Sequence, residues 1–328
     1  MIPCAETHEL KMPKTVALER ESKLEVFNRE TLIKGKPAQV ACVEIGGQTF
    51  TVKKGPLTVV QLQDEWYEDV RDPELVIDVL INSAEFKPDI LTLWQRVPNV
   101  EPQHQYHTEW ESIAALPVQS YDHWFNKQIS SRLRSQLRKA TKEGLNVREA
   151  AYDDEFVRGM TEIFNEAAVR QGRRFWHYGK DFETVKQQFS RYLFREEMIG
   201  AYYGGEMIGF IMLGNAGNYG ITGQIISKLK YRDKVTNNAL IGKAVEVCAK
   251  KNLAYLVYLY WTNDSLAEFK RRCGFQETKV PRYFVPLTRK GKLALKLGLH
   301  RGWRATLPDR IKRPLKKLRK SWHGFRAE

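Results

Sequence analysis

The feature that most constrains the fold of this chain is residues 198–275, where strand and helix patterns alternate in a fixed order. Two largely apolar runs, Met198–Tyr203 and Glu206–Leu213, flank the dipeptide Gly204-Gly205. Two glycines supply the positive φ angles of a tight hairpin turn, so we predict a β-hairpin here. A third run, 219–228, predicts a further strand.

A helix and a buried strand are predicted after the loop 229–236. Asn237 is the expected N-cap of this helix. Leu253–Trp261 is a nearly continuous apolar and aromatic run, as in a strand covered on both faces by helices. A short helix then closes on Gly274-Phe275. The apolar positions of the first helix fall at helical spacing: Leu240, Ile241, Ala244, Val245, Val247 and Cys248.

The first half of the chain reads as a second α/β unit. Gln39–Ile45 and Gln48–Lys53 flank Gly46-Gly47, which predicts a second hairpin of the same kind. Asp72 and Pro73 form an N-cap and first-turn pair, so we expect a helix to about residue 86. Strands are expected over 56–63, 89–97 and 107–116.

Three passages together resemble a known family: the hairpin with its Gly-Gly turn, Lys230–Asn237 entering a helix, and Asn263–Phe275. Their order is similar to the acyl-transfer core of the GNAT superfamily, in its FemAB-like and CelD-like branch with a BioF-like acetyltransferase domain. Residues 64–74 resemble the amino-terminal half of CelD-like proteins, where a degenerate GNAT-like domain precedes the active one. The resemblance implies an α/β fold of two GNAT-like mixed-sheet domains in tandem, followed by a basic amphipathic C-terminal tail.

The expected organisation follows from these passages. Residues 1–24 are an unplaced N-terminal segment, and residues 25–119 are the degenerate GNAT-like domain. A basic connecting helix is expected over 120–145. The GNAT acyltransferase domain is expected over 146–288, and the tail over 289–328.

The resemblance implies a donor site between the strands 219–228 and 253–261. There an amine attacks the acyl carbonyl, and the resulting oxyanion needs a hydrogen-bond donor. In coenzyme A enzymes an Arg-x-x-Gly-x-Gly loop binds the donor pyrophosphate at a helix N-terminus. Arg232 matches the arginine here, but Val235 and Asn237 replace the glycines. Acyl-coenzyme A is therefore the first expected donor, and aminoacyl-tRNA is the alternative. The candidate donor-binding residues are Gln224, Tyr231, Arg232, Asn237, Asn238 and Asn263.

Lys270 is the candidate catalytic residue. It lies seven positions after Asn263, where coenzyme A enzymes usually carry a tyrosine and FemAB-like enzymes often carry a lysine. An ammonium there would stabilise the oxyanion or protonate the leaving group. The alternative is that Lys270 is one more surface cation beside Arg271 and Arg272.

Two segments are candidates for binding the acceptor. A long helix predicted over Tyr121–Gly144, with Ser120 as N-cap, places Arg134 and Arg138 on one face. Arginine can grip phosphate or carboxylate with two hydrogen bonds. The alternative is a solvated amphipathic helix with Leu133 and Leu137 packed inward.

The loop Gly172–Gly179 mixes arginines with aromatic residues, as sites for sugars or anions often do. Arg174, Trp176 and Tyr178 are the acceptor-binding candidates in it. Alternatively, Phe175 and Trp176 plug the core.

The basic character of the chain is concentrated in its tail. Residues 289–328 hold 14 of the 53 Lys and Arg residues but only two of the 39 acids, or +12 of the net charge of +14. An apolar stripe from Leu307 to Phe325 recurs at helical spacing among these cations. A basic amphipathic helix suits an anionic membrane surface. Contact with RNA, tRNA included, and docking on the protein's own core are the alternatives.

Cysteine spacing and the lengths of the apolar runs indicate the cellular compartment. The four cysteines are scattered, and no His or Cys spacing indicates a metal site, so we expect free thiols in a reducing compartment. Residues 1–16 lack the apolar core of a signal peptide, and no run approaches eighteen apolar residues. We expect a cytoplasmic protein, either free or peripheral on the inner face of the plasma membrane.

These inferences predict an N-acyltransferase. The acceptor would be an amine on a lipid-linked or nucleotide-linked amino sugar or peptide, a precursor of cell-envelope polysaccharide or peptidoglycan. Two alternatives stay open: an aminoacyl-tRNA-dependent aminoacyltransferase, and a catalytically inactive binding module with the same fold.

Overall fold

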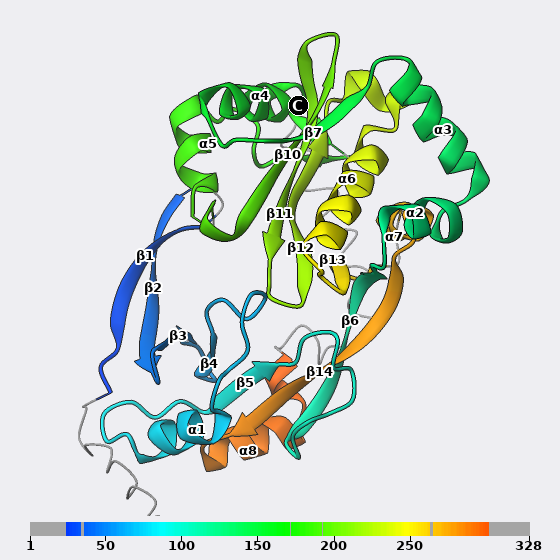
Figure 1. Cartoon of the computed structure of the whole chain (residues 1–328). Coiled ribbons are helices and arrows are strands. Elements are labelled where there is room, and N and C mark those ends of the chain that lie inside the picture. The colour runs from blue at the N-terminus through cyan, green and yellow to red at the C-terminus, as the bar shows by residue number, and fades with distance from the viewer. Residues whose placement is uncertain (1–23, 34–35, 171, 192, 263–264, 302–328) are drawn as a thin grey trace, which may run out of the picture.

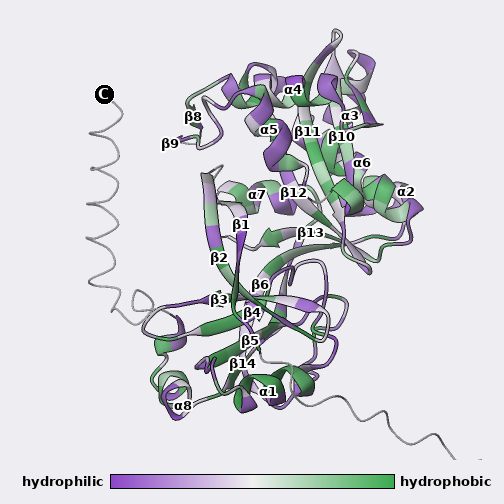
Figure 2. Ribbon diagram, turned by 90° about the vertical axis from the view of Figure 1, so that its left-hand side faces the viewer, coloured by the Kyte–Doolittle hydropathy of each residue, from purple (hydrophilic) through white to green (hydrophobic). Residues whose placement is uncertain are grey.

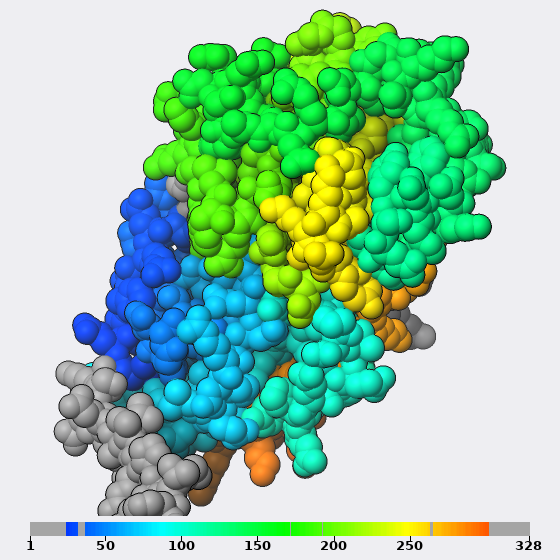
Figure 3. All heavy atoms as spheres, in the orientation of Figure 1, coloured from blue at the N-terminus to red at the C-terminus, as the bar shows by residue number. Residues whose placement is uncertain are grey.

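The structure is a computed structural model that describes residues 24–33, 36–170, 172–191, 193–262 and 265–301. It is built around one mixed β-sheet of twelve strands, with helices on both faces (Figure 1). The two halves of the chain pack into one continuous body (Figure 3).

The N-terminal half contains one Gly-Gly hairpin and one crossover helix. Its elements are β1 (Phe27–Ile33), β2 (Lys36–Ile45), β3 (Gln48–Lys53), β4 (Val59–Leu62), α1 (Pro73–Asn82), β5 (Ile90–Trp94) and β6 (His107–Pro117). Gly46 and Gly47 turn the chain with φ angles of 57° and 69°, as predicted. The Asp72 side chain accepts from the Leu75 amide and starts α1, which joins the parallel strands β4 and β5.

The C-terminal half repeats this plan with more elements. They are β7 (Asn146–Ala150), α4 (Asp154–Asn165), β8 (Val169–Arg170), β9 (Arg173–Arg174), α5 (Phe182–Phe189), η2 (Leu193–Arg195), β10 (Glu196–Tyr203), β11 (Glu206–Asn215), β12 (Tyr219–Ser227), η3 (Leu229–Lys234), α6 (Thr236–Lys250), β13 (Tyr255–Tyr260), α7 (Ser265–Arg272), β14 (Gln276–Pro286), α8 (Arg289–Lys296) and η4 (Leu299–Arg301). The predicted hairpin at Gly204-Gly205 joins β10 and β11, and α6 joins the parallel strands β12 and β13.

The two halves exchange strands where they meet. β6 leaves the N-terminal half to pair with β13, and β14 leaves the C-terminal half to pair with β5. β6 and β14 also pair with each other. The strand order is therefore β1-β2-β3-β4-β5-β14-β6-β13-β12-β11-β10-β7, a single sheet shared by both halves.

Two faces of the sheet are covered differently. The α6 face is covered by α1 over one half and by α6 over the other, each on its own apolar cluster. The opposite side, which we call the α4 face, is covered by α4 and α5 at one end and by α8 at the other. Between them Trp66 and Tyr67, in the loop after β4, pack against Ile221 and Val257.

The predicted single helix over Tyr121–Gly144 is wrong. The segment forms α2 (Tyr121–His123), the π-helical turn η1 (Trp124–Gln128) and then α3 (Ser131–Lys142). Ile129 is extended, and the Ser130 hydroxyl accepts from the Leu133 amide. Ser130 thus caps a new helix, which breaks the segment in two.

Other predicted boundaries also shift. Asn237 is not an N-cap, because α6 starts one residue earlier, at Thr236. The predicted strand 56–63 and the predicted helix 72–86 are each shorter than expected, as β4 and α1. The tail stripe from Leu307 to Phe325 lies outside the described residues. Within the described ranges, the structure contains no helix long and apolar enough to cross a membrane.

Candidate active site

β12 and β13 separate after a short parallel contact. They pair from Tyr219–Tyr255 to Ile221–Val257, and beyond that point β13 bends away at Leu259, whose φ is 44°. β12 carries a bulge at Gly223, which is exposed although it lies in the interior of the sheet. We call the gap beyond the Ile221–Val257 pair the fork. Exposed strand backbone at such a gap offers hydrogen-bonding groups to a bound molecule.

Lys270 lies at the β13 side of the fork. Its ammonium donates to the carbonyl oxygens of Tyr258 at 2.8 Å and Tyr260 at 2.6 Å, and the side chain is 1% exposed. The alternative of a surface cation is therefore wrong for Lys270, whereas its neighbours Arg271 and Arg272 are exposed. Burying an ammonium is costly unless it is hydrogen-bonded, and these carbonyls supply such bonds. Asn263 lies outside the described residues.

The start of α6 has an unusual backbone. Val235 precedes the helix with φ 47° and ψ 36°, the left-handed region that a β-branched residue rarely adopts. A glycine would adopt it freely. Val235 stands where the Arg-x-x-Gly-x-Gly pattern has its first glycine, so this turn has a glycine-like conformation without the glycine. Nearby, Thr236 Oγ1 and Asn237 Oδ1 are buried without a partner among the described residues.

The other donor-binding candidates have different environments. Asn238 is buried and its Nδ2 donates to Cys273 Sγ at 3.1 Å, which joins α6 to the end of α7. The Tyr231 hydroxyl donates to Glu206 Oε2 at 2.5 Å. Gln224 is partly buried just past the β12 bulge, and Arg232 is exposed on η3. The fork therefore has Gln224 at its edge, whereas Asn238 and Tyr231 bond within the chain.

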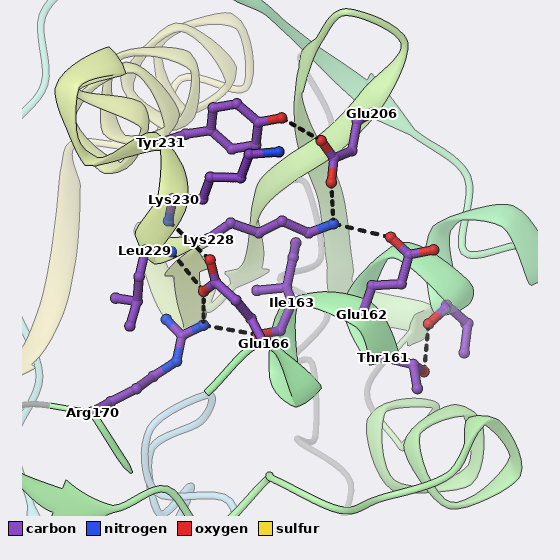
Figure 4. A network of polar contacts seen from close by, with 11 residues as sticks. Thr161, Glu162, Ile163, Glu166, Arg170, Glu206, Lys228, Leu229, Lys230 and Tyr231 are labelled. Carbon is purple, nitrogen blue, oxygen red and sulfur yellow. Dashed lines mark hydrogen bonds and ion pairs between the residues drawn. The ribbon is translucent and has the colours of Figure 1, made fainter. Parts of the chain in front are cut away.

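Carboxylates fix the loop between β12 and α6 (Figure 4). The buried Lys228 ammonium pairs with Glu162 of α4 at 3.0 Å and with Glu206 of β11 at 2.5 Å. Glu166 accepts from the Leu229 amide at 2.6 Å and from the next amide at 2.9 Å. Glu162 of α4 and Glu166, the C-cap residue of that helix, thus hold the loop that leads into the Val235 turn.

A glutamate that the sequence analysis did not single out faces the fork from the α4 face. Glu196 Oε1 accepts from the Tyr67 hydroxyl at 3.2 Å and lies 3.3 Å from the place where a Cβ at Gly223 would be. Burial raises the pKa of the Glu196 carboxyl to about 7, against the opposing effects of Tyr67 and Arg195. A carboxyl with such a pKa can exchange protons near neutral pH.

Glycine makes this arrangement possible. A Cβ at Gly214 would lie 2.7 Å from the Tyr67 ring, so a side chain there would displace the tyrosine. Tyr67 and Glu196 are 129 residues apart in the chain, and no local pattern relates them. Only the Glu196-Glu197 pair at the start of the hairpin could have drawn attention to this position.

Arg134 and Arg138, two of the acceptor-binding candidates, lie on α3 beside η3. Arg134 Nη1 donates to the carbonyls of Asn126 at 3.1 Å and Ile129 at 2.7 Å, which closes the η1 turn. Arg138 lies over the Phe125 ring, with 5.2 Å from Cζ to the centroid. α3 lies beside η3, so the structure does not bring these arginines together with the loop 172–179.

The loop after β8 exposes two aromatic side chains on the α4 side. Trp176 and Tyr178 are 48% and 49% exposed, and Arg174 is exposed too. His177 between them is buried and stacks on Phe164 with 4.2 Å between ring centroids. Burial lowers the pKa of His177 to about 3, so this ring is neutral. The alternative that Phe175 and Trp176 plug the core is right for Phe175, which packs against the α4 cluster, and wrong for Trp176, because His177 is the buried ring at that point.

Three potential metal ligands that the sequence did not indicate meet at His107, Glu109 and His300. His300 Nε2 and Arg301 Nε both contact the same oxygen, Glu109 Oε1. A guanidinium on that oxygen opposes a metal ion there. We interpret the group as an ion-pair cluster that fixes η4 on β6.

Solved structures of known proteins have folds similar to that of this chain. No protein-family model and no curated protein sequence matches the chain. The fold is similar to the C-terminal domain of a protein from Agrobacterium fabrum described as a lysylphosphatidylglycerol synthetase: 10% identity, 78% of this chain and 87% of that chain covered, TM-score 0.52. It is also similar to FemX: 13% identity, 83% and 90% covered, TM-score 0.53. A tandem GNAT protein from the clavulanic acid biosynthesis pathway matches with 10% identity, 76% and 83% covered, and TM-score 0.42.

At these identities the likeness concerns the fold alone. The chain has a GNAT-like fold that it shares with FemX and with the Agrobacterium fabrum domain, and its own two halves repeat one plan of strands and helices. The predicted α/β fold of two similar mixed-sheet units is confirmed, whereas the predicted tail beyond residue 301 lies outside the described residues.

Proposed function

We propose that this protein is an N-acyltransferase that works at the fork between β12 and β13. The observation that carries the proposal is Lys270, buried on α7 and bonded to the carbonyls of Tyr258 and Tyr260 where the two strands separate. A buried ammonium beside an accessible gap in a sheet suits the stabilisation of negative charge that develops during a reaction.

The donor's acyl carbonyl would lie along β12 at Gly223, where the strand backbone is exposed. An amine attacks the carbonyl carbon, a C–N bond forms, and the bond from that carbon to the leaving sulfur or oxygen breaks. Lys270 stabilises the tetrahedral oxyanion, and it or solvent supplies the proton that the leaving group takes.

Glu196 would take the proton that the attacking nitrogen loses. It lies over the Gly223 bulge on the face opposite α6, and its pKa of about 7 lets it be a carboxylate at neutral pH and still bind a proton well. Tyr67 holds it in place through the 3.2 Å hydrogen bond. The acceptor amine would thus arrive from the α4 face, past Arg174, Trp176 and Tyr178.

Acyl-coenzyme A is the proposed donor. The support is the Val235 turn, whose left-handed residue sets up the helix start at which GNAT enzymes bind pyrophosphate. Arg232 and Asn237 would contact the phosphates, Gln224 the acyl arm, and Asn263 remains a proposed donor contact.

Aminoacyl-tRNA is the second candidate donor, and the surface beside η3 favours it. α3 lies there, and its cations form a basic surface of the kind that binds a nucleic-acid backbone. The likeness to FemX and to the Agrobacterium fabrum protein is compatible with this donor. The exposed cations of α3 are Arg132, Arg138, Lys139 and Lys142.

The proposed acceptor is an amine on a lipid-linked or nucleotide-linked envelope precursor, either an amino sugar or a peptide. The direct test supplies two radiolabelled donors, acetyl-coenzyme A and lysyl-tRNA, together with extracted envelope precursors, and follows transfer of the label. Transfer that Lys270→Met abolishes supports the proposal. No transfer and no binding of either donor would favour the inactive binding module.

A further inference from the structure

α8 leaves one of its faces unpartnered. Its buried side, with Ala294 and Leu295, packs against Ile90 and Phe284 of the sheet. On the other side Leu293 and Leu297 are 56% and 57% exposed. These two leucines are four residues apart, so they are neighbours on one helix surface. Leu299 in η4 extends this apolar surface at 44% exposed.

Cations surround these leucines. Arg289, Lys290, Lys292 and Lys296 are exposed on α8, and Arg301 is exposed at the end of η4. Residues 289–301 contain no acid, and the following residues 302–328 contain nine Lys or Arg and two acids by sequence. An exposed single leucine is ordinary on a protein surface. Paired leucines within an all-cationic segment are not, and they fit an anionic surface with an apolar interior.

A second projection on the same side of the molecule has a related composition. Arg173, Arg174, Trp176 and Tyr178 are exposed in and after β9, and Val169 of β8 is 52% exposed. Figure 2 shows that α8 and the β8–β9 ribbon both project on the left of the molecule, away from α1, α2 and α3. Trp and Tyr beside cations are typical of protein surfaces at the membrane–water interface.

We propose that this side of the molecule, with α8 and the β8–β9 ribbon as two contact points, binds an anionic phospholipid surface. The leucines and aromatic rings enter the interface while the lysines and arginines meet the anionic head groups. An RNA partner would use the cations and rings, but it would leave Leu293 and Leu297 without a role.

The orientation has a consequence that rests on the proposed function. Glu196 and the Gly223 bulge open on the α4 face, the same face that α8 covers at its other end. A protein bound by this side holds the acceptor side of the fork toward the lipid. A lipid-linked amine would then reach the fork without leaving the membrane, whereas the α3 and η3 side stays open to a water-soluble donor.

The test is sedimentation of the full chain with vesicles of equal parts phosphatidylglycerol and phosphatidylcholine, against vesicles of phosphatidylcholine alone. We expect binding to the anionic vesicles only. The double variant Leu293→Glu with Leu297→Glu should lower the partition coefficient about tenfold or more, because two apolar side chains no longer enter the interface. Trp176→Glu with Tyr178→Glu should lower it as well.

Matched controls exist on the opposite face. Ile81 on α1 and Trp110 on β6 are each 51% exposed, and Trp110 points to the α6 face by strand alternation. Ile81→Glu and Trp110→Glu should bind vesicles like the wild type. Thermal unfolding followed by circular dichroism checks that each variant folds. Lys292→Glu with Lys296→Glu provides a second test that keeps the leucines.

Three results would overturn the proposal: wild-type binding by the leucine variant, which would assign binding to residues 302–328 alone; equal binding to phosphatidylcholine; or binding to tRNA with none to vesicles. The assay uses neither donor nor acceptor. Its failure would leave the transferase proposal standing, and inactivity of the enzyme would leave the vesicle result standing.

Discussion

Both halves of the sheet run from an edge strand through a Gly-Gly hairpin to a pair of parallel strands, which are β4 and β5 in one half and β12 and β13 in the other. The C-terminal half inserts α4, the β8–β9 ribbon and α5 between its edge strand β7 and the hairpin, whereas β2 follows β1 almost directly. That insertion carries Trp176 and the carboxylates Glu162 and Glu166, which hold the loop before α6. The inserted helices α4 and α5 thus cover the α4 face of the C-terminal half, whereas α8 covers that face in the N-terminal half.

The buried cations beside the two parallel strand pairs also have different hydrogen-bond partners. Beside β4 and β5, Arg282 of β14 donates to both oxygens of Glu65 at 2.9 and 3.0 Å and to Glu111 at 2.7 Å. Beside β12 and β13, the buried Lys270 of α7 donates to the carbonyls of Tyr258 and Tyr260 at the fork. In the N-terminal half of the sheet, the buried Arg282 guanidinium bonds to two acids of the fold. This role is structural.

The crossover helices differ as well. α1 starts with the relaxed pair Asp72 and Pro73, whereas α6 starts after the left-handed Val235 with no side-chain cap. Backbone strain of this kind tends to persist at functional sites.

The largest expected effect is on stability in the N-terminal half. Arg282→Ala leaves Glu65 and Glu111 buried without their cation, which should cost about 3–5 kcal/mol in the free energy of unfolding. Urea denaturation measures this, and Arg71→Ala, which removes an exposed pair with Glu68 at 3.9 Å, is the control. A loss of less than about 1 kcal/mol in the free energy of unfolding of Arg282→Ala would contradict the structural role assigned to this cation.

The next effect is on activity in the C-terminal half. Lys270→Met keeps the aliphatic stem but removes the ammonium, and it should lower kcat about 10²–10³-fold through loss of oxyanion stabilisation. Arg271→Met, the exposed neighbour, should leave kcat unchanged. Equal losses in the two variants would return Lys270 to a structural role.

Glu196→Gln should lower kcat/KM about 10²-fold and remove its dependence on pH. In the wild type, activity should rise with pH through an apparent pKa of about 7, since only the carboxylate accepts the proton. Tyr67→Phe removes a hydrogen bond to the Glu196 carboxylate, so the pH at which activity rises should move to a higher value. A wild-type pH profile in Glu196→Gln would exclude the assigned role.

The same glutamate makes a prediction about stability. Its folded pKa is raised above the ordinary value of 4.5, so the folded state holds its proton more tightly than the unfolded state. Stability from this group is therefore present below about pH 4.5 and is lost as pH rises to about 7. Glu196→Gln should be more stable than the wild type above pH 7 and similar below pH 4.5, as measured by urea denaturation across pH.

The smallest expected effect is at the start of α6. Val235→Gly relieves a left-handed β-branched residue and should stabilise the protein by about 1 kcal/mol, after the entropy cost of glycine. Ala249→Gly, later in the same helix, should destabilise it by a similar amount. A destabilised Val235→Gly variant would show that the valine side chain matters more than the turn.

Local signals made much of the fold predictable. The two Gly-Gly dipeptides, the Asp72-Pro73 pair and the apolar spacing of 240–248 each specify an element within a few residues. Lys270 was singled out as a candidate because its distance from Asn263 matched a family pattern, and its catalytic role stays a prediction. The exchange of β6 and β14 had no local signal, since strand partners are chosen by the whole sheet.

The contact between Glu196 and Tyr67 beside the fork was missed for the same reason. Glu196 and Tyr67 meet only because the loop after β4 crosses the sheet over Gly214. The break at Ser130 could have been predicted, because serine before an amphipathic run is an N-cap signal. The strain at Val235 is a backbone property, and a valine in sequence does not indicate it.

The most direct test of the central claim is a calorimetric titration with acetyl-coenzyme A of the wild type and of Gly223→Leu, which fills the exposed bulge. The account predicts saturable micromolar binding to the wild type and its loss in the variant. Unchanged affinity in Gly223→Leu would place the donor elsewhere than the fork. Absence of binding to the wild type would contradict acyl-coenzyme A as the donor.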